Sequence, residues 1–118
     1  MRLLFALLPL VALLTPDPAQ AHAILISGTP APGMTVPPGP LDVRLRYNSR
    51  IDKGRSRLTL TAPDHTQATL PITPGAVPDV LDSSANLSPG PYVLRWQVLA
   101  VDGHITRGNV AFTVAARR

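Results

Sequence analysis

The sequence predicts an all-β fold, an immunoglobulin-like antiparallel β-sandwich with Greek-key connections and about seven strands. Fourteen prolines and eight glycines in 118 residues interrupt the chain at short intervals, which disfavours long helices. Between these breaks apolar and polar residues alternate, the period-2 pattern of half-buried strands. Several such segments with no predicted helix, in a chain of this length, favour two packed sheets.

Seven segments carry the strand pattern, and each is bounded by turn residues. The first is a short apolar run. The second alternates cleanly, with Asp42, Arg44 and Arg46 on its polar face, and the third repeats this with Leu58 and Leu60 inward. The fourth and fifth alternate less regularly, the sixth is the longest, and the seventh ends in alternating apolar residues. In order they are AILIS (23–27), LDVRLRY (41–47), SRLTLTA (56–62), TQATLPI (66–72), VPDVLDSS (77–84), PYVLRWQVLA (91–100) and NVAFTV (109–114).

The first 21 residues have the pattern of a secretory signal peptide. Arg2 precedes the apolar run LLFALLPLVALL (3–14), and a proline-broken segment then ends in the small residue Ala21. The run is shorter than the roughly 20 apolar residues that a membrane-spanning helix needs. We therefore expect cleavage after Ala21 and a single soluble domain, residues 22–118, in the periplasm or secreted. This mature chain begins with His22.

Composition and charge exclude several classes of protein. The chain has no cysteine, so neither disulfides nor a thiolate metal site is possible, and all seven acidic residues are aspartate. Removing Arg2 and Asp17 with the signal peptide leaves ten basic and six acidic residues, so the net charge of +4 is retained. The arginines are dispersed with few aromatics between them, which argues against nucleic-acid binding. The charge favours a solvated surface that anionic membrane headgroups would attract.

Strand alternation predicts which connections lie at the same end of the sandwich. The start of the first strand, the connection at 48–55 and the connection at 102–105 share one end. His22, Asp102 and His104 are therefore expected in one neighbourhood. His65 lies in a connection at the opposite end and is interpreted as a surface-turn residue.

These three residues have the chemistry of a metal site. Asp102 and His104 are two residues apart, so in extended backbone their side chains project to the same side, and Gly103 permits a tight turn. With the terminal amine and imidazole of His22 they offer three nitrogens and one oxygen. Cu(II) prefers such N,O ligation, whereas zinc favours tetrahedral sites that often contain thiolates. Each histidine alone would be interpreted as an ordinary exposed residue.

The chain also resembles the CopC-type exported copper-resistance and copper-carrier proteins over essentially the whole mature sequence. The first matching feature is a histidine directly after the signal peptide. The other two are an S-x-T-P-A-P-G-type segment (27–33) and a W-x-V…D-G-H…G…F-x-V block within 96–114. The matching stretches are HAILISGTPAPGMTV (22–36), LDVRLRYNSRID (41–52) and YVLRWQVLAVDGHITRGNVAFTV (92–114).

The resemblance implies a small β-sandwich that binds one Cu(II) ion through His22, Asp102 and His104. It further implies copper resistance, homeostasis or supply, with a CopD-like membrane copper transporter as a possible partner. A second, Cu(I)-binding, methionine-rich site is not expected, because Met34 is the only methionine left after cleavage. Asp52 is the candidate for a further carboxylate near the copper.

Two other classes of function are weighed against a copper carrier. A copper histidine-brace oxidoreductase, a monooxygenase-like enzyme, needs an open copper face and an aromatic platform. Strand parity turns Tyr47, Tyr92, Trp96 and Phe112 inward, and no Ser-His-Asp set is present, so we expect no enzyme. A metal-free immunoglobulin-like interaction domain would not explain why His22 directly follows the predicted cleavage site.

Overall fold

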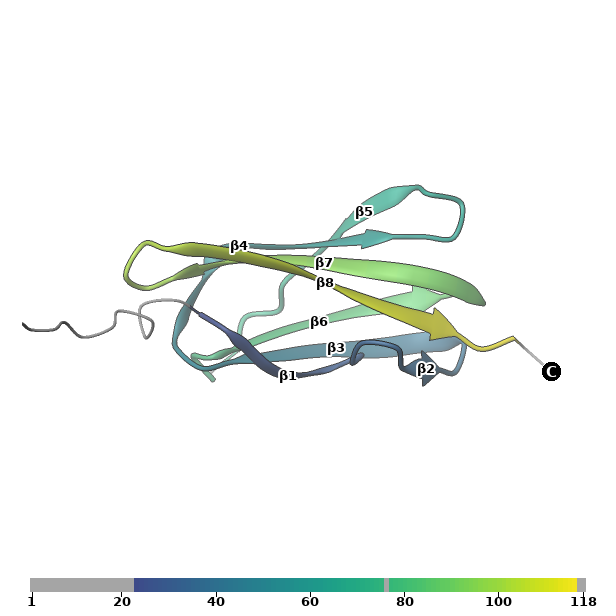
Figure 1. Ribbon diagram of the computed structural model, residues 1–118, viewed down its shortest axis with the longest axis horizontal. Helices are drawn as coiled ribbons and strands as arrows, with labels where there is room; N and C mark the ends of the chain where they lie inside the picture. The colour runs from purple at the N-terminus through teal and green to yellow at the C-terminus, as the bar shows by residue number, and fades with distance from the viewer. Residues whose placement is uncertain (1–22, 76, 117–118) are drawn as a thin grey trace, which may run out of the picture.

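The protein folds as a sandwich of two β-sheets, with no helix among the residues that the computed structural model describes, 23–75 and 77–116. Figure 1 shows the two layers facing each other. One sheet has the order β1-β3-β6: β1 (Leu25–Thr29), β3 (Gly39–Tyr47) and β6 (Val80–Leu87). The other has the order β2-β8-β7-β4-β5: β2 (Thr35–Val36), β8 (Ile105–Val114), β7 (Gly90–Ala100), β4 (Ile51–Thr61) and β5 (Gln67–Leu70). The chain crosses repeatedly between the sheets, so the predicted sandwich is confirmed.

Apolar burial holds the two layers together. The inward side chains of β3, β4, β7 and β8 alternate with exposed ones and form one continuous core. Two aromatic contacts lie within it: Tyr47 meets Trp96 edge-on at 5.3 Å between ring centroids, and Tyr92 stacks on Phe112 at 5.6 Å. The Tyr92 hydroxyl donates a 2.9 Å hydrogen bond to the carbonyl of Ser88, the corner bond typical of such sandwiches.

One strand was not predicted, so the described residues form eight strands rather than about seven. The two residues of β2 pair in parallel with the end of β8, with Thr35 opposite Thr113 and Val36 opposite Val114. The sheet containing them is therefore not purely antiparallel. Two residues within a proline- and glycine-rich connection carry no alternation, which is why the sequence pattern missed this strand.

The predicted bounds of β4 and β8 also need correction. β4 begins at Ile51 rather than 56, so much of the expected 48–55 connection is strand. A register shift between Asp52 and Arg57 breaks the alternation there and hides the strand from pattern analysis. β8 begins at Ile105 rather than 109, because its ladder with β7 continues to the pair Leu99–Ile105. The remaining strands shift by smaller amounts.

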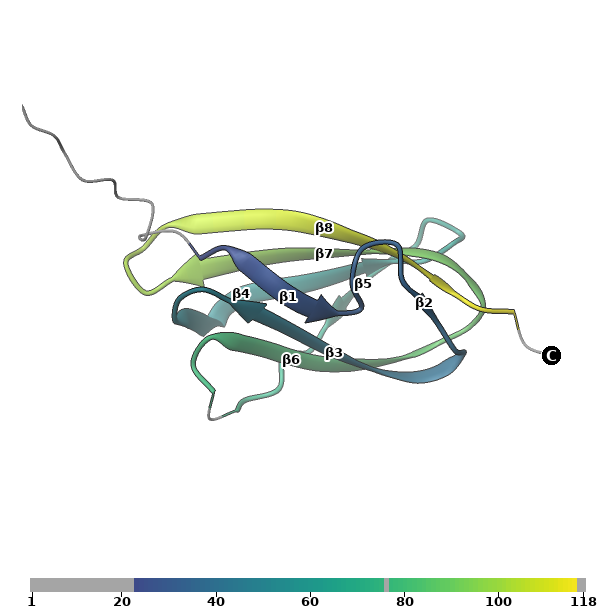
Figure 2. The same ribbon diagram turned by 60° about the horizontal axis from the view of Figure 1, so that its bottom comes forward.

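The fold places the start of the described chain and the β7–β8 turn at one end of the sandwich. Figures 1 and 2 show β1 beginning at the end where β7 joins β8. Within the described residues no helix is long and apolar enough to cross a membrane. The segment 1–21, interpreted as a signal peptide, lies outside them.

Candidate metal centre

The turn between β7 and β8 carries two of the three predicted ligands. The Ala100 amide donates to the His104 carbonyl at 2.8 Å, and the Gly103 amide donates to the Ala100 carbonyl at 2.9 Å. Gly103 has a φ of +94°, a conformation that residues with a Cβ rarely adopt. The expected turn-permitting role of this glycine is confirmed, and the turn fixes Asp102 and His104 relative to each other.

Asp102 and His104 are in direct contact. One carboxylate oxygen of Asp102, Oδ2, lies 3.0 Å from His104 Nδ1, and the other, Oδ1, accepts the His104 amide at 3.1 Å. The two side chains do lie together, but the reason differs from the expected one. They are not neighbours on an extended strand; the carboxylate instead folds back over a turn of the kind aspartate favours. Both side chains keep partial contact with solvent, 55% exposed for His104 and 34% for Asp102.

The third predicted ligand, His22, lies outside the described residues, but its neighbour Ala23 is firmly placed. Ala23 is 1% exposed, and its carbonyl accepts a 2.7 Å hydrogen bond from the Thr106 hydroxyl, two residues beyond His104. The Ile24 backbone exchanges two hydrogen bonds with Asn48 in the β3–β4 turn, at 2.7 and 2.9 Å. The start of the described chain is thus held between β8 and this turn. No local pattern in the sequence pointed to Thr106 or Asn48.

Asp52, the candidate for a further carboxylate, does not join Asp102 and His104. Its Oδ2 lies 3.8 Å from the guanidinium Nε of Arg55 on the same strand. Across residues 23–75 and 77–116, no group of three or more His, Cys, Asp or Glu side chains is placed to hold a metal ion. The described part of the chain therefore supplies a pair of candidate ligands, Asp102 and His104.

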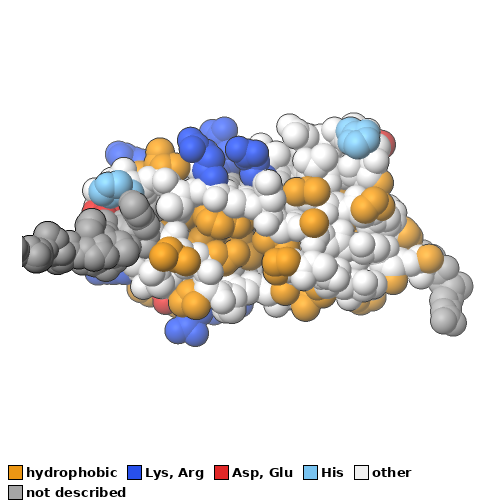
Figure 3. Space-filling view, in the orientation of Figure 1, with side chains coloured by type: hydrophobic (Ala, Val, Ile, Leu, Met, Phe, Trp, Pro, Cys, Tyr) orange, Lys and Arg blue, Asp and Glu red, His pale blue; other side chains and the backbone are white. Residues whose placement is uncertain are grey.

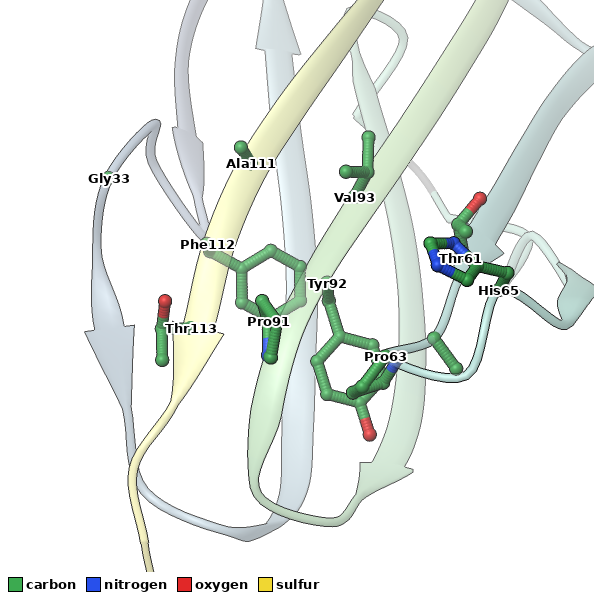
Figure 4. Close-up of a pocket in the computed structure, with 11 residues that line it drawn as sticks. Gly33, Thr61, Pro63, His65, Pro91, Tyr92, Val93, Ala111, Phe112 and Thr113 are labelled. Carbon is green, nitrogen blue, oxygen red and sulfur yellow. The ribbon is translucent and has the colours of Figure 1, made fainter.

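His65 lies at the opposite end of the molecule, as the strand count predicted. It occupies the β4–β5 turn with a φ of +71°. Figure 3 shows the two described histidine side chains, coloured pale blue, at opposite ends of the sandwich. His65 and Pro63 border a largely apolar hollow of about 370 Å³ with Tyr92 and Phe112 (Figure 4). This hollow brings no second metal-ligating side chain to His65.

The aromatic residues are core residues, as predicted. Tyr47 is fully buried and Trp96 is 8% exposed. Neither the Tyr47 hydroxyl nor Trp96 Nε1 has a hydrogen-bond partner among residues 23–75 and 77–116. Burial raises the pKa of the Tyr47 phenol well above its ordinary value of 10, so this group stays neutral and is not a phenolate ligand.

Comparison with known proteins agrees with the fold. A family model of the CopC domain matches residues 25–115. The chain belongs to the CopC family. Protein YobA of Escherichia coli K12 is 31% identical over 107 residues, covering 87% of this chain and 86% of the relative.

Two solved structures share the sandwich. CopC from Methylosinus trichosporium OB3b matches with a TM-score of 0.73 and 26% identity, over 82% of this chain and 97% of that one. PcoC, a methionine-rich copper resistance protein from Escherichia coli, matches with a TM-score of 0.60 and 26% identity, over 80% and 99%. The present chain is not methionine-rich: it contains only Met1 and Met34. Met34 lies beside the end of β8, away from the β7–β8 turn, with its carbonyl accepting from Thr113 at 2.9 Å.

Proposed function

We propose that the mature chain, residues 22–118, is a periplasmic copper-binding protein that takes up one Cu(II) ion through His22, Asp102 and His104. It would serve copper resistance or homeostasis, or deliver the ion to a membrane transporter of the CopD type. Copper is the cargo in this proposal, and the protein performs no chemistry on it. Membership of the CopC family and similarity to a copper resistance protein support the choice of metal.

One observation carries the proposal, the hydrogen bond from Thr106 to the carbonyl of Ala23. Thr106 follows His104 by two residues, and Ala23 follows His22 by one peptide bond. Consecutive Cα atoms are about 3.8 Å apart, so this bond limits how far His22 can lie from the β7–β8 turn. A terminal histidine tethered in this way supports a site shared with Asp102 and His104.

The donor atoms suit Cu(II). A terminal histidine released by signal cleavage provides an amine and an imidazole on one residue, and both can bind the same ion. Because Nδ1 of His104 lies against Asp102, this imidazole would bind through Nε2. An ion on Nε2 lies on the far side of the ring from Nδ1, so Asp102 would have to leave Nδ1 of His104 to offer the same ion an oxygen.

A histidine-brace oxidoreductase is the alternative function, because such an enzyme would also bind copper through the terminal residue His22. Such an enzyme needs an exposed aromatic platform for its substrate, and the four aromatic residues of the described chain are 0–8% exposed. Their burial favours binding over catalysis. That the protein is not an enzyme remains a prediction, tested by whether the copper-loaded chain consumes reductant and oxygen in the presence of a polysaccharide.

Two histidine substitutions test the proposal. The mature chain should bind one Cu(II) ion, and His104→Ala should weaken binding by at least tenfold in competition with a chelator. His65→Ala removes the same side chain at the far end of the molecule and should leave the affinity unchanged. Equal affinity of the His104→Ala variant and the parent would refute the proposed site.

A further inference from the structure

The outer face of the five-stranded sheet carries three arginines that form no ion pair with an acidic residue of the described chain. Arg57 on β4 lies opposite Gln97 on β7, which lies opposite Arg107 on β8, and Arg95 is two residues from Gln97 along β7. All three arginines are exposed. Arg107 donates a 2.8 Å hydrogen bond to Gln97, and none of the three forms an ion pair with a described carboxylate. Figure 3 shows basic side chains gathered over β4, β7 and β8. Arg57, Arg95 and Arg107 are called the arginine face below.

The other sheet is different, because its arginines are paired. Arg44 on β3 lies 3.0 Å from Asp82, and Arg46 lies 3.8 Å from Asp79. Positive charge that is already compensated attracts a distant anionic surface weakly. Among the arginines on the strands of the described chain, those without an ion pair therefore lie on one side, the outer face of β4, β7 and β8.

Exposed aliphatic side chains extend this face toward the β7–β8 turn. Leu99 and Ile105 are the next cross-strand pair on the same face beyond Gln97 and Arg107, and Ile105 is 50% exposed. Val101, in the turn itself, is 67% exposed. The face thus ends in an aliphatic tip, defined here as Val101 and Ile105. Beside the basic residues, these two exposed side chains offer apolar contact to a partner surface.

We propose that the arginine face and the aliphatic tip dock on an anionic phospholipid surface. Anionic headgroups attract basic side chains, and aliphatic side chains beside them enter the boundary between headgroups and acyl chains. The three guanidinium groups lie on the same face of one sheet, so they can meet a single surface together. The aliphatic tip favours lipid over an acidic protein, because guanidinium groups alone would suffice to pair with carboxylates. The net charge of +4 acts in the same direction.

Docking in this orientation has a consequence for the candidate metal centre. Asp102 and His104 lie in the turn between Val101 and Ile105, so they would be held at the membrane surface. This consequence rests on the proposed copper function, but lipid binding itself requires no metal. The two proposals can therefore fail separately.

Vesicle binding by the mature chain in the presence of EDTA tests the proposal. The chain should co-sediment with vesicles of phosphatidylglycerol and phosphatidylcholine, but not with phosphatidylcholine alone, and added salt should weaken binding. The double variant Arg57→Gln/Arg95→Gln should lose about fivefold in affinity for each arginine, roughly 25-fold in all. The matched control Arg44→Gln/Arg46→Gln removes the same charge from the opposite sheet and should bind like the parent. Circular dichroism shows whether each variant is folded.

A tip variant completes the test. Val101→Ser should weaken vesicle binding by up to about tenfold while leaving the net charge unchanged. Equal losses in the two double variants would show that net charge alone matters, and would overturn the proposal. Binding to polyglutamate that depends on Arg57 and Arg95, with vesicles left unbound, would overturn it in favour of an acidic protein partner.

Discussion

Replacing Thr106 by valine tests how the start of the chain is held beside the β7–β8 turn. The change removes the hydroxyl that donates a 2.7 Å hydrogen bond to the Ala23 carbonyl and keeps the shape of the side chain. Ala23 is 1% exposed, so its carbonyl would be left buried without this donor. A buried polar group without a partner costs about 1–3 kcal/mol. For a domain of about 100 residues this corresponds to a fall of roughly 4–8 °C in Tm for each kcal/mol.

The same substitution should weaken copper binding. If the chain start is no longer held, the ion must order it on binding, and a loss of about 1.4 kcal/mol lowers the affinity tenfold. Chelator competition gives the affinity for Cu(II), and thermal unfolding monitored by circular dichroism gives Tm. Thr113→Val is the control, because Thr113 lies exposed on the same strand and its hydroxyl takes part in no hydrogen bond within the described chain. A Thr106→Val variant with unchanged Cu(II) affinity would refute the reasoning that this bond prepares the metal site.

Three further substitutions test the packing and the electrostatics. Gly108→Ala should lower the stability by about 1–3 kcal/mol in urea unfolding, because the added Cβ would overlap indole atoms of Trp96. Tyr47→Phe should raise the stability by about 1 kcal/mol, because it removes a buried hydroxyl to which the described chain offers no hydrogen-bond partner. Thr66→Val should raise the pKa of Asp64, which the Thr66 hydroxyl and amide hold below its ordinary value of 3.8, as NMR titration of the carboxyl carbon would show. A lowered pKa in the folded state contributes stability that is present above about pH 4 and is lost as the pH falls through that lowered value. The Thr66→Val variant should therefore lose less stability on acidification than the parent.

Each of these variants has a matched control. Gly54→Ala adds the same methyl group where the nearest atom lies 3.6 Å away, so it should cost less than Gly108→Ala. Tyr92→Phe removes a hydroxyl that does donate to Ser88 and should lower the stability, opposite in sign to Tyr47→Phe. Thr69→Val on β5 should leave the Asp64 titration unchanged. Controls that behave like the test variants would contradict the structural reasons given for them.

Much of the fold could be predicted because strand periodicity is a local property. In β3 the residues with even and odd numbers separate cleanly into an exposed and a buried face. Turn residues mark where each strand ends, and alternating strand direction then assigns each connection to an end of the sandwich. This reasoning placed His65 at the end opposite Asp102 and His104, and it placed the chain start beside the β3–β4 and β7–β8 turns. The contacts of Ala23 and Ile24 confirm the latter.

The rest depends on contacts that leave no local pattern. β2 is two residues long and exists because β8 lies beside it. The bulge in β4 interrupts the alternation between Asp52 and Arg57, which made a strand look like a loop. The bond between Thr106 and Ala23 joins residues 83 positions apart, and no spacing rule predicts such a contact. The sequence also could not show that Arg44 and Arg46 of one sheet are paired with aspartates, whereas Arg57, Arg95 and Arg107 of the other form no ion pair with a described carboxylate.

The terminal amine of His22 is the feature that makes the proposed site depend on signal cleavage, and one comparison tests it directly. Cu(II) affinity is measured by chelator competition for the mature chain beginning at His22 and for the same chain with one glycine added before it. Mass spectrometry confirms each N-terminus. The extension leaves every side chain in place and turns the amine into an amide. A fall of several orders of magnitude in affinity is the predicted result. Equal affinity would contradict the claim that the amine is a ligand.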